Sequence, residues 1–407
     1  MNTPLEIEYF ISLSKKFPLI DVRSPAEFEH GHIPNAHNIP LFDNEERAKV
    51  GTAYKQISRE KAIEIGYKLA NPKLNAFISQ IKKITSEQPN IQTIKHSNDE
   101  LPTVLVHCWR GGMRSAKFAE LLNEHGYKTH TLTRGYKAYR NFVLKSFESS
   151  ANILIIGGET GSGKTEILKK IGESGEQIID LENLAHHKGS AFGALGEKRQ
   201  PTQEQFENEL SHIWNKFISP LSFGPNEVAD SVFSERVRWT LSRVLADHWR
   251  EGPGVRRLWL EDESRSIGTC QLPNSIWEKM KQAPILRINI PKQLRIERLM
   301  NDYGKFSKEE LAICIHKIEK RLGPQHAKQA LEELEKGNLK TVADITLTYY
   351  DKAYNHDHEK RNMKDVFFIE CKNADVNQNA KKVLDFANTS LRTARNEAGS
   401  NLKNIES

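Results

Sequence analysis

The chain has 407 residues, 38% hydrophobic and 28% charged, which is enough to bury more than one core, so we expect two or three domains. Its formal net charge of +6 at pH 7 suits a polyanionic partner such as a nucleic acid without requiring one. Four widely spaced cysteines without a Cys-x-x-Cys pair argue against a disulfide framework or a thiolate zinc site, and no apolar run could cross a bilayer, which favours a cytoplasmic protein.

The first segment alternates strand and helix signals. Residues 18–22 form a short apolar strand, and Ser24, Pro25 and Glu27 then form a helix start with a reciprocal cap. Gly31 ends this helix, and "HNIPL" predicts another strand. Residues 86–100 are polar and predict a surface excursion.

A cysteine follows the next apolar strand. "VLVHCWRGGMRSAKFAELL" runs from a strand through a loop into a helical pattern, Gly126 ends the helix, and "KTHTLT" predicts a further strand. Strand, loop, helix and strand in this order indicate a parallel α/β sheet. We therefore place a first α/β domain at residues 1–146.

Cys108 begins a Cys-x5-Arg loop. We expect its amides and arginines to surround the sulfur and stabilise a thiolate. The loop comprises Trp109, Arg110, Gly111, Gly112, Met113 and Arg114. Two chemistries use such a cradle: the thiolate attacks phosphorus, or it accepts a chalcogen atom and carries it as a persulfide or the selenium analogue.

A P-loop opens the second segment. "NILIIGGETGSGKTEILKK" matches Gly-x-x-x-x-Gly-Lys-Thr between a β-branched strand and a helix. Its phosphate-binding residues are expected to be Gly158, Thr160, Gly161, Ser162, Gly163, Lys164 and Thr165. We assign residues 147–291 to this P-loop domain, which also includes a strand at 284–291.

Polar residues follow other predicted strands of this domain. Because ligands bind beyond the carboxyl ends of parallel strands, we expect Asp180, Glu261, Asp262 and Arg265 to form an acidic and polar site. Asp262 is our choice for a Walker B role, in which it would hold Mg²⁺ together with Thr165.

Residues 292–392 read as a helix-rich region with one late strand, "DVFFIEC". Its repeated basic residues form either a solvated face or a lid over phosphate or RNA. Residues 393–407 are expected to be a disordered tail.

Several motifs together resemble a known family. "LIDVRSPAEFEHGHIPNAHNIPL", "VHCWRGGMRS" and "TLTRGYKAYR" resemble a rhodanese domain, whose single cysteine carries sulfur. With "GGETGSGKTE", "HHKGSAFGALG", "QPTQEQFEN", "LEDESRSIG", "RLGPQHAKQALEELEKGN" and "YYDKAYNHD", the chain is similar to the tRNA 2-selenouridine synthases from about Pro18 to Asp357. Many rhodaneses have Gly-Gly where this chain has Arg134-Gly135, which leaves the local turn uncertain.

The resemblance implies a rhodanese-like domain followed by a P-loop NTPase-like parallel-sheet domain with a helix-rich C-terminal part. It also implies an enzyme that S-geranylates wobble 2-thiouridine of tRNA from geranyl diphosphate and then selenates it with selenophosphate. Cys108 would be catalytic and the P-loop would hold the diphosphate, with Mg²⁺ as a possible cofactor. The implied partners are the tRNA anticodon stem-loop and a supplier of selenophosphate.

Further candidates depend on this interpretation. An allylic cation favours aromatic walls, for which we consider Phe192, Phe206, Trp239 and Trp259. His186 and Lys188 are candidates for phosphate contacts. The arginines considered for contacts with tRNA phosphates are Arg236, Arg238, Arg256, Arg257 and Arg321.

Two alternatives remain open from the residues alone. The first is a P-loop kinase or ATPase fused to a Cys-x5-Arg phosphatase or sulfurtransferase domain. The second is a non-catalytic tRNA-binding scaffold, which the loop-bound thiol and the complete P-loop disfavour.

Overall fold

The computed structural model of the chain describes residues 3–87, 101–218, 257–359 and 366–403. It divides into two compact units, residues 1–146 with 202–212, and residues 147–201 with 213–407. Within the described ranges, no helix combines the length and the apolar composition that crossing a membrane requires. All four cysteines are buried and free, as the expectation of no disulfide framework requires.

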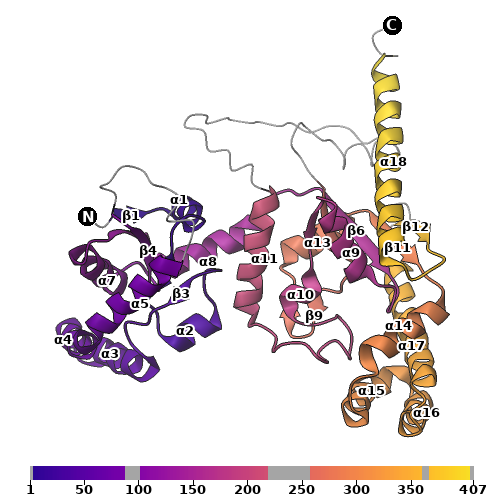
Figure 1. Ribbon diagram of the computed structural model, residues 1–407, viewed down its shortest axis with the longest axis horizontal. Helices are drawn as coiled ribbons and strands as arrows, with labels where there is room; N and C mark the ends of the chain where they lie inside the picture. Colours follow the sequence, from indigo (N-terminus) through magenta and orange to yellow (C-terminus); the bar gives the residue numbers. More distant parts are fainter. Residues whose placement is uncertain (1–2, 88–100, 219–256, 360–365, 404–407) are drawn as a thin grey trace. The chain divides into compact units, whose positions relative to one another are not determined.

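The first unit contains a five-stranded parallel sheet (Figure 1). The strands follow the order β1-β5-β4-β2-β3. Their bounds are Thr3–Leu5 (β1), Leu19–Asp21 (β2), His37–Asn38 (β3), Thr103–His107 (β4) and Lys128–Leu132 (β5). Val104, Leu105 and Val106 of the central β4 are fully buried, as expected for a parallel strand covered on both faces.

Helices cover this sheet. They are α1 (Ile7–Ser14), α2 (Pro25–His30), α3 (Asn44–Gln56), α4 (Arg59–Ala70), the 3₁₀ turn η1 (Asn71–Lys73), α5 (Leu74–Glu87), α7 (Met113–Glu124) and α8 (Gly135–Ser146). The predicted capping box of α2 is present, with Ser24 as N-cap and Glu27 bonding back to it. Helices α3, α4 and α5 were not predicted from the sequence. Helices α3 and α4 are rich in charged residues, whereas α5 has an apolar stripe that includes Phe77, Ile78 and Ile81.

The first unit also includes a distant segment. Residues 202–212, which contain most of α11 (Gln203–Ile218), belong to it, whereas the remainder of α11 belongs to the second unit. This division into compact units differs from the domain limits predicted from the sequence, which place all of α11 in the P-loop domain. A return of the chain to an earlier domain leaves no local signal in the sequence.

The second unit contains another five-stranded parallel sheet, with the order β12-β11-β6-β8-β7. Its strands are β6 (Ile153–Gly158), β7 (Gln177–Ile179), β8 (Leu258–Glu261), β11 (Ile285–Asn289) and β12 (Val366–Glu370), and a separate hairpin pairs β9 (Ser266–Ile267) with β10 (Cys270–Gln271). The central β6 leads into the P-loop, so the phosphate site lies at the carboxyl edge of the sheet.

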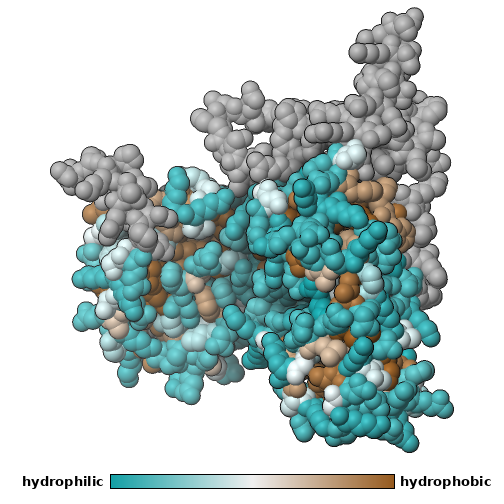
Figure 2. Space-filling view, turned by 45° about the vertical axis from the view of Figure 1, so that its right-hand side comes forward, coloured by the Kyte–Doolittle hydropathy of each residue, from teal (hydrophilic) through white to brown (hydrophobic). Residues whose placement is uncertain are grey.

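The helices of this unit fall into two groups. Their bounds are α9 (Lys164–Glu173), α10 (Leu181–Ala185), α13 (Asn274–Gln282), α14 (Lys292–Tyr303), α15 (Lys308–Leu322), α16 (Pro324–Glu335), α17 (Leu339–Glu359) and α18 (Val376–Lys403). Figure 1 shows α9 and α18 side by side, and both pack on the sheet in one apolar cluster. Helices α15–α17 form a second apolar cluster. Figure 2 shows hydrophobic patches on the surface at the lower right, at the level of these helices.

The expected strands and the helix-rich region are present, but the expected tail is not. Helix α18 continues to Lys403, so the prediction of a disordered segment from residue 393 is wrong as far as residue 403. The segment contains no proline and many good helix formers, which lets the helix propagate. Of the polar surface segment predicted at residues 86–100, residues 86 and 87 lie in α5 and the others lie outside the described residues.

Candidate functional sites

Cys108 lies between the end of β4 and the start of α7. Its side chain is 2% exposed, and Sγ is 3.2 Å from the hydroxyl oxygen of Ser115 in the first turn of α7. The amino-terminal amides of α7 have no partners within the helix and lie just beyond the loop, which favours an anion there. The thiol therefore lies where the sequence places it, at the carboxyl edge of the sheet beside a helix start.

The arginines of the loop do not both converge on the sulfur. Arg114 Nη1 donates to Glu27 Oε2 at 2.9 Å, and Arg47 Nε lies 3.5 Å from the same oxygen. Burial would raise the pKa of Glu27, but the Arg114 guanidinium outweighs this effect and holds the pKa below its usual value. Arg110 is exposed. The Arg114 guanidinium, which the sequence predicts to add positive charge around the sulfur, is thus already paired with a carboxylate of α2.

The other loop residues differ in exposure. Trp109 is half-buried, and its ring centroid lies 5.7 Å from that of Tyr136. Gly111, Gly112 and Met113 are exposed. The polypeptide of the loop is thus open to solvent while the sulfur that it surrounds is buried.

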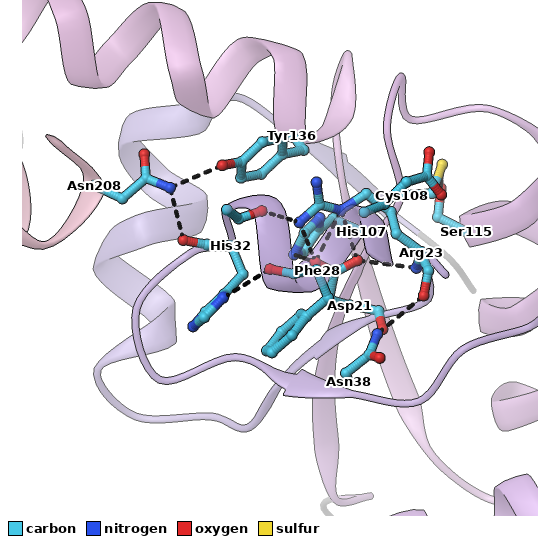
Figure 3. Close-up of polar contacts among 12 residues, drawn as sticks. Asp21, Arg23, Phe28, His32, Asn38, His107, Cys108, Ser115, Tyr136 and Asn208 are labelled. Atoms are coloured by element: carbon cyan, nitrogen blue, oxygen red, sulfur yellow. Dashed lines mark hydrogen bonds and ion pairs between the residues drawn. The ribbon is translucent and has the colours of Figure 1, made fainter. Parts of the chain in front are cut away.

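A buried ion pair supports the floor of this site (Figure 3). Arg23 and Asp21 are both fully buried, with Nη2 of Arg23 2.6 Å from Oδ2 of Asp21. The same guanidinium donates to the Gly31 carbonyl and lies 3.8 Å from the ring centroid of Tyr136. Burial lowers the pKa of His107 to about 4, so the imidazole beside this pair is neutral at pH 7. Sequence reasoning missed these residues, although Asp21 and Arg23 lie in the quoted "LIDVRSPAEF" motif.

Helix α11 is bonded to the same site. Asn208 Nδ2 donates to the Tyr136 hydroxyl at 2.8 Å and to the His32 carbonyl at 2.9 Å (Figure 3). The Tyr136 hydroxyl donates in turn to Glu204 Oε1 at 3.0 Å. Residues 202–208 of the segment "QPTQEQFEN" therefore belong to the rhodanese-like unit, whereas Gln200 donates to the Ala185 and Ile267 carbonyls of the second unit.

The Arg134-Gly135 turn closes the cysteine loop from the other side. Both residues have left-handed backbone conformations, with φ of 58° and 57°. A Cβ on Gly135 would lie 2.2 Å from the Cys108 carbonyl oxygen, so only glycine fits there. Arg134 thus adopts a left-handed conformation of the kind that favours glycine, and the turn that the sequence left uncertain is formed.

The P-loop has the strand-to-helix geometry that the motif predicts. Gly161 and Gly163 have φ of 79° and 78°, and Lys164 is the first residue of α9. The Ser162 hydroxyl is buried without a hydrogen-bond partner. A free hydroxyl and free amides at a helix start provide donors for phosphate oxygens.

Carboxylates surround the cationic end of α9. The Thr165 hydroxyl donates to Glu182 Oε2 at 2.8 Å, and Glu261 Oε2 accepts from the Leu181 amide at 3.0 Å. Burial, followed by the charge of Glu182, raises the pKa of Glu263 to about 8. Asp180 caps α10 by accepting from the Asn183 amide. Sequence reasoning missed Glu182, which only its position after strand β7 could have indicated. Glu263 was considered with Glu261 and Asp262 after strand β8 but was not chosen over a helix cap.

Asp262 has a different position from the one that a Walker B role requires. It accepts from the Tyr354 hydroxyl at 2.9 Å, and that hydroxyl accepts from the Gly158 amide at 2.7 Å. Thr165 is bonded to Glu182, so the predicted magnesium pair of Thr165 and Asp262 is not formed. In the described part of the chain, no three His, Cys, Asp or Glu side chains are arranged to hold a metal ion. Magnesium binding by Thr165 and Asp262 stays a prediction from the sequence.

Helix α14 adds cations to the P-loop. Arg295 Nη1 donates to the Thr160 carbonyl at 3.2 Å, and the same side chain pairs with Glu159 and Asp351. A Cβ on Gly163 would lie 2.8 Å from the guanidinium of Arg298. Sequence reasoning did not select these arginines, because α14 follows the P-loop by more than a hundred residues.

The remaining candidates are dispersed. Arg265 is exposed beside the β9-β10 hairpin, Arg321 is exposed on α15, and Arg257 pairs with Glu176. Phe206 and Trp259 are fully buried core residues of the first and second units. His186 bonds to the Arg199 carbonyl, and Lys188 is exposed with its ammonium 3.5 Å from Glu197. Trp239, Arg236, Arg238 and Arg256 lie outside the described residues.

These two sites define a two-domain enzyme that combines a rhodanese-like unit with a P-loop unit. Residues 7–142 match the rhodanese-like domain family, and residues 151–218 and 238–385 match the tRNA 2-selenouridine synthase AAA domain. The chain belongs to the tRNA 2-selenouridine synthase family.

Several relatives carry that family name. The protein of Serratia proteamaculans (strain 568) is 32% identical over 382 residues, which cover 86% of this chain and 89% of the relative. The protein of Shewanella denitrificans is 30% identical over 86% of this chain and 90% of its own length. The protein of Hahella chejuensis is 30% identical over 84% and 86% of the two chains.

Proposed function

We propose that this enzyme converts wobble 2-thiouridine of tRNA into 2-selenouridine in two steps at two sites. Geranyl diphosphate reacts at the P-loop, and selenophosphate reacts at the cysteine loop. The observation that carries the proposal is the presence, in one chain of this family, of a loop-bound thiol and a P-loop. The enzyme would meet the anticodon stem-loop and a supplier of selenophosphate in the cytoplasm.

In the first step, the thiocarbonyl sulfur attacks C1 of geranyl diphosphate. A C–S bond forms, the C–O bond breaks, and its electron pair leaves with the diphosphate. The ammonium of Lys164 and the free amides at the start of α9 stabilise the departing charge. Arg298 lies beside Gly163, but Glu166 pairs with its guanidinium at 3.0 Å, so Lys164 and the amides carry this role in the proposal.

In the second step, the selenium of selenophosphate adds to C2 of the geranylated base and geranylthiolate leaves. Water then cleaves the P–Se bond to give phosphate and 2-selenouridine. Selenium is already at the selenide level, so this exchange needs no oxidant. Transfer of the selenium atom to the Cys108 sulfur, as in a persulfide, would need an oxidant. We therefore assign Cys108 to the selenation step without a selenium atom bound to its sulfur.

The pairing of Arg114 with Glu27 argues against the phosphatase alternative. A Cys-x5-Arg phosphatase uses its arginine to bind a phosphate dianion, whereas here the carboxylate already occupies the guanidinium at 2.9 Å. The bonds of Thr165 to Glu182 and of Asp262 to Tyr354 likewise weigh against an ATPase of the usual magnesium-dependent kind.

The proposal is tested by nucleoside mass spectrometry after the protein reacts with thiolated tRNA, geranyl diphosphate and selenophosphate. We expect wild-type protein to form 2-selenouridine and Cys108→Ser to accumulate the geranylated nucleoside. Cys314→Ser, which changes another buried free cysteine, is the matched control and should behave as wild type. Three results would each contradict the proposal: Cys108→Ser still forms 2-selenouridine, Cys108→Ser loses geranylation as fully as selenation, or the wild-type protein turns over ATP without tRNA.

A further inference from the structure

An apolar pocket adjoins the P-loop in the second unit. Its walls come from Thr160 of the P-loop, from residues Ser190 and Phe192, and from helices α14, α15 and α17. We propose that this pocket binds the hydrocarbon chain of the prenyl diphosphate and that its floor limits the length of chain the enzyme accepts. The inference rests on the proposed geranyl transfer and names the part of the chain that selects the donor.

The pocket and the phosphate cradle share structural elements. The Thr160 carbonyl accepts from Arg295 of α14, and a Cβ on Gly161 would lie 3.3 Å from Leu299 Cγ. Leu299, Met300 and Tyr303 of the same helix line the pocket. A ligand with phosphates on the P-loop would therefore direct an attached chain along α14 into apolar surroundings.

The polar atoms of the pocket walls are largely used within the protein. The Thr346 hydroxyl donates to the Val342 carbonyl at 2.9 Å. Ser190 Oγ accepts from the Phe192 amide, and the Tyr350 hydroxyl accepts from the Ala191 amide, both at 3.2 Å. Walls with satisfied polar atoms offer little to a purine base but favour hydrocarbon.

Aromatic rings suit the allylic half of the donor. The rings of Phe192 and Tyr303 meet edge to face, with centroids 5.7 Å apart. Burial raises the pKa of the Tyr303 phenol, so the ring stays neutral at physiological pH. Electron-rich aromatic faces stabilise positive charge that develops on a carbon as diphosphate departs. Phe192 is thus the aromatic candidate from the sequence that lies beside the P-loop.

The dimensions of the pocket favour short chains. Its free volume is about 60 Å³, so an entering chain must displace flexible side chains such as Met300. We take as its floor the most deeply buried lining residues, Leu311, Thr346 and Val342, which are 4%, 5% and 7% exposed. Leu311 and Val342 belong to the apolar cluster of α15–α17. Because these residues are held by packing, they limit how deep a chain can extend.

Two substitutions test the floor in opposite directions. Leu311→Ala should deepen the pocket and raise, at least tenfold, the kcat/KM for farnesyl diphosphate relative to that for geranyl diphosphate. Ala343→Leu should fill the pocket and lower use of geranyl diphosphate at least tenfold while affecting dimethylallyl diphosphate less. Leu334→Ala is the control, because Leu334 is buried in the same cluster but does not line the pocket.

The assay measures prenylated nucleoside by mass spectrometry, with binding of inorganic diphosphate as a second readout. We expect Ala343→Leu to bind inorganic diphosphate as wild type does, which separates pocket filling from unfolding. If wild-type protein transfers no prenyl group, the proposed function fails. If wild-type protein geranylates tRNA but Leu311→Ala and Ala343→Leu leave donor preference unchanged, only the assignment of the pocket fails.

Discussion

Replacing Lys164 with alanine should slow geranyl transfer at least about a hundredfold. The ammonium lies at the amino terminus of α9, where the loop amides converge on the expected position of the diphosphate. Removing one donor to a developing oxyanion costs about 3 kcal/mol, and each 1.4 kcal/mol is a factor of about ten in rate. The loss should appear in kcat, because most of the charge develops as the C–O bond breaks.

The neighbouring carboxylates should add a second effect, on donor binding. Burial raises the pKa of Glu182, and the positive charge of Lys164 opposes that rise. Without Lys164, the charges of Glu182 and Glu263 would face the diphosphate unopposed, so KM should also rise. Because the pKa of Glu263 is raised to about 8, protonation removes its charge as the pH falls from 8 towards 6, and the KM defect should shrink.

The experiment follows geranylated nucleoside from thiolated tRNA over a range of geranyl diphosphate concentrations. Lys170→Ala is the control, since Lys170 lies on the same helix but pairs with Glu173 near the surface, and it should change the rate less than twofold. A parental rate for Lys164→Ala would refute the assignment of the P-loop to the prenyl donor.

Two further predictions concern stability. Glu263 has a folded-state pKa of about 8, above its usual 4.5, so the folded protein holds more protons between these values and stability falls as pH rises through this window. Glu263→Gln should therefore reduce the fall in melting temperature between pH 5 and 8, and an unchanged slope would contradict the shift. Gly135→Ala should destabilise the first unit by more than the roughly 1–3 kcal/mol of left-handed strain, because its Cβ meets the Cys108 carbonyl. Gly126→Ala, with φ of 81° but open space around its Cβ, should show the strain alone in thermal unfolding, and equal effects of the two substitutions would contradict the clash.

The parts of the fold that depend on local sequence could be predicted. Two connections are local in the sequence: the one from β4 through Cys108 into α7, and the one from β6 through the P-loop into α9. Each occupies fewer than about twenty-five consecutive residues. Glycines, a helix start and a β-branched run carry such signals within a short window. The strand that contains the late "DVFFIEC" motif was likewise predictable as β12.

The contacts that complete each site could not be predicted in this way. Tyr136 and Asn208 meet across 72 positions, and Gly158 and Tyr354 across 196 positions. A hydrogen bond at such separation depends on tertiary packing, which one sequence does not reveal. The same reason applies to Asp262, because its place after β8 suggests a magnesium ligand, whereas the approach of Tyr354 to its carboxylate has no local signal.

In both sites, a carboxylate is already hydrogen-bonded to a side chain that the sequence predicts to face the anionic substrate. Glu27 holds Arg114 in the cysteine loop, and Glu182 accepts from Thr165 beside Lys164. An arriving anion must compete with the carboxylate, so each site binds anions less tightly than the same residues would without it. On the proposed two-site scheme, weaker binding would speed the release of diphosphate and phosphate, and product release limits turnover in many enzymes. On this reasoning, Glu27 and Glu182 favour product release at the expense of substrate affinity.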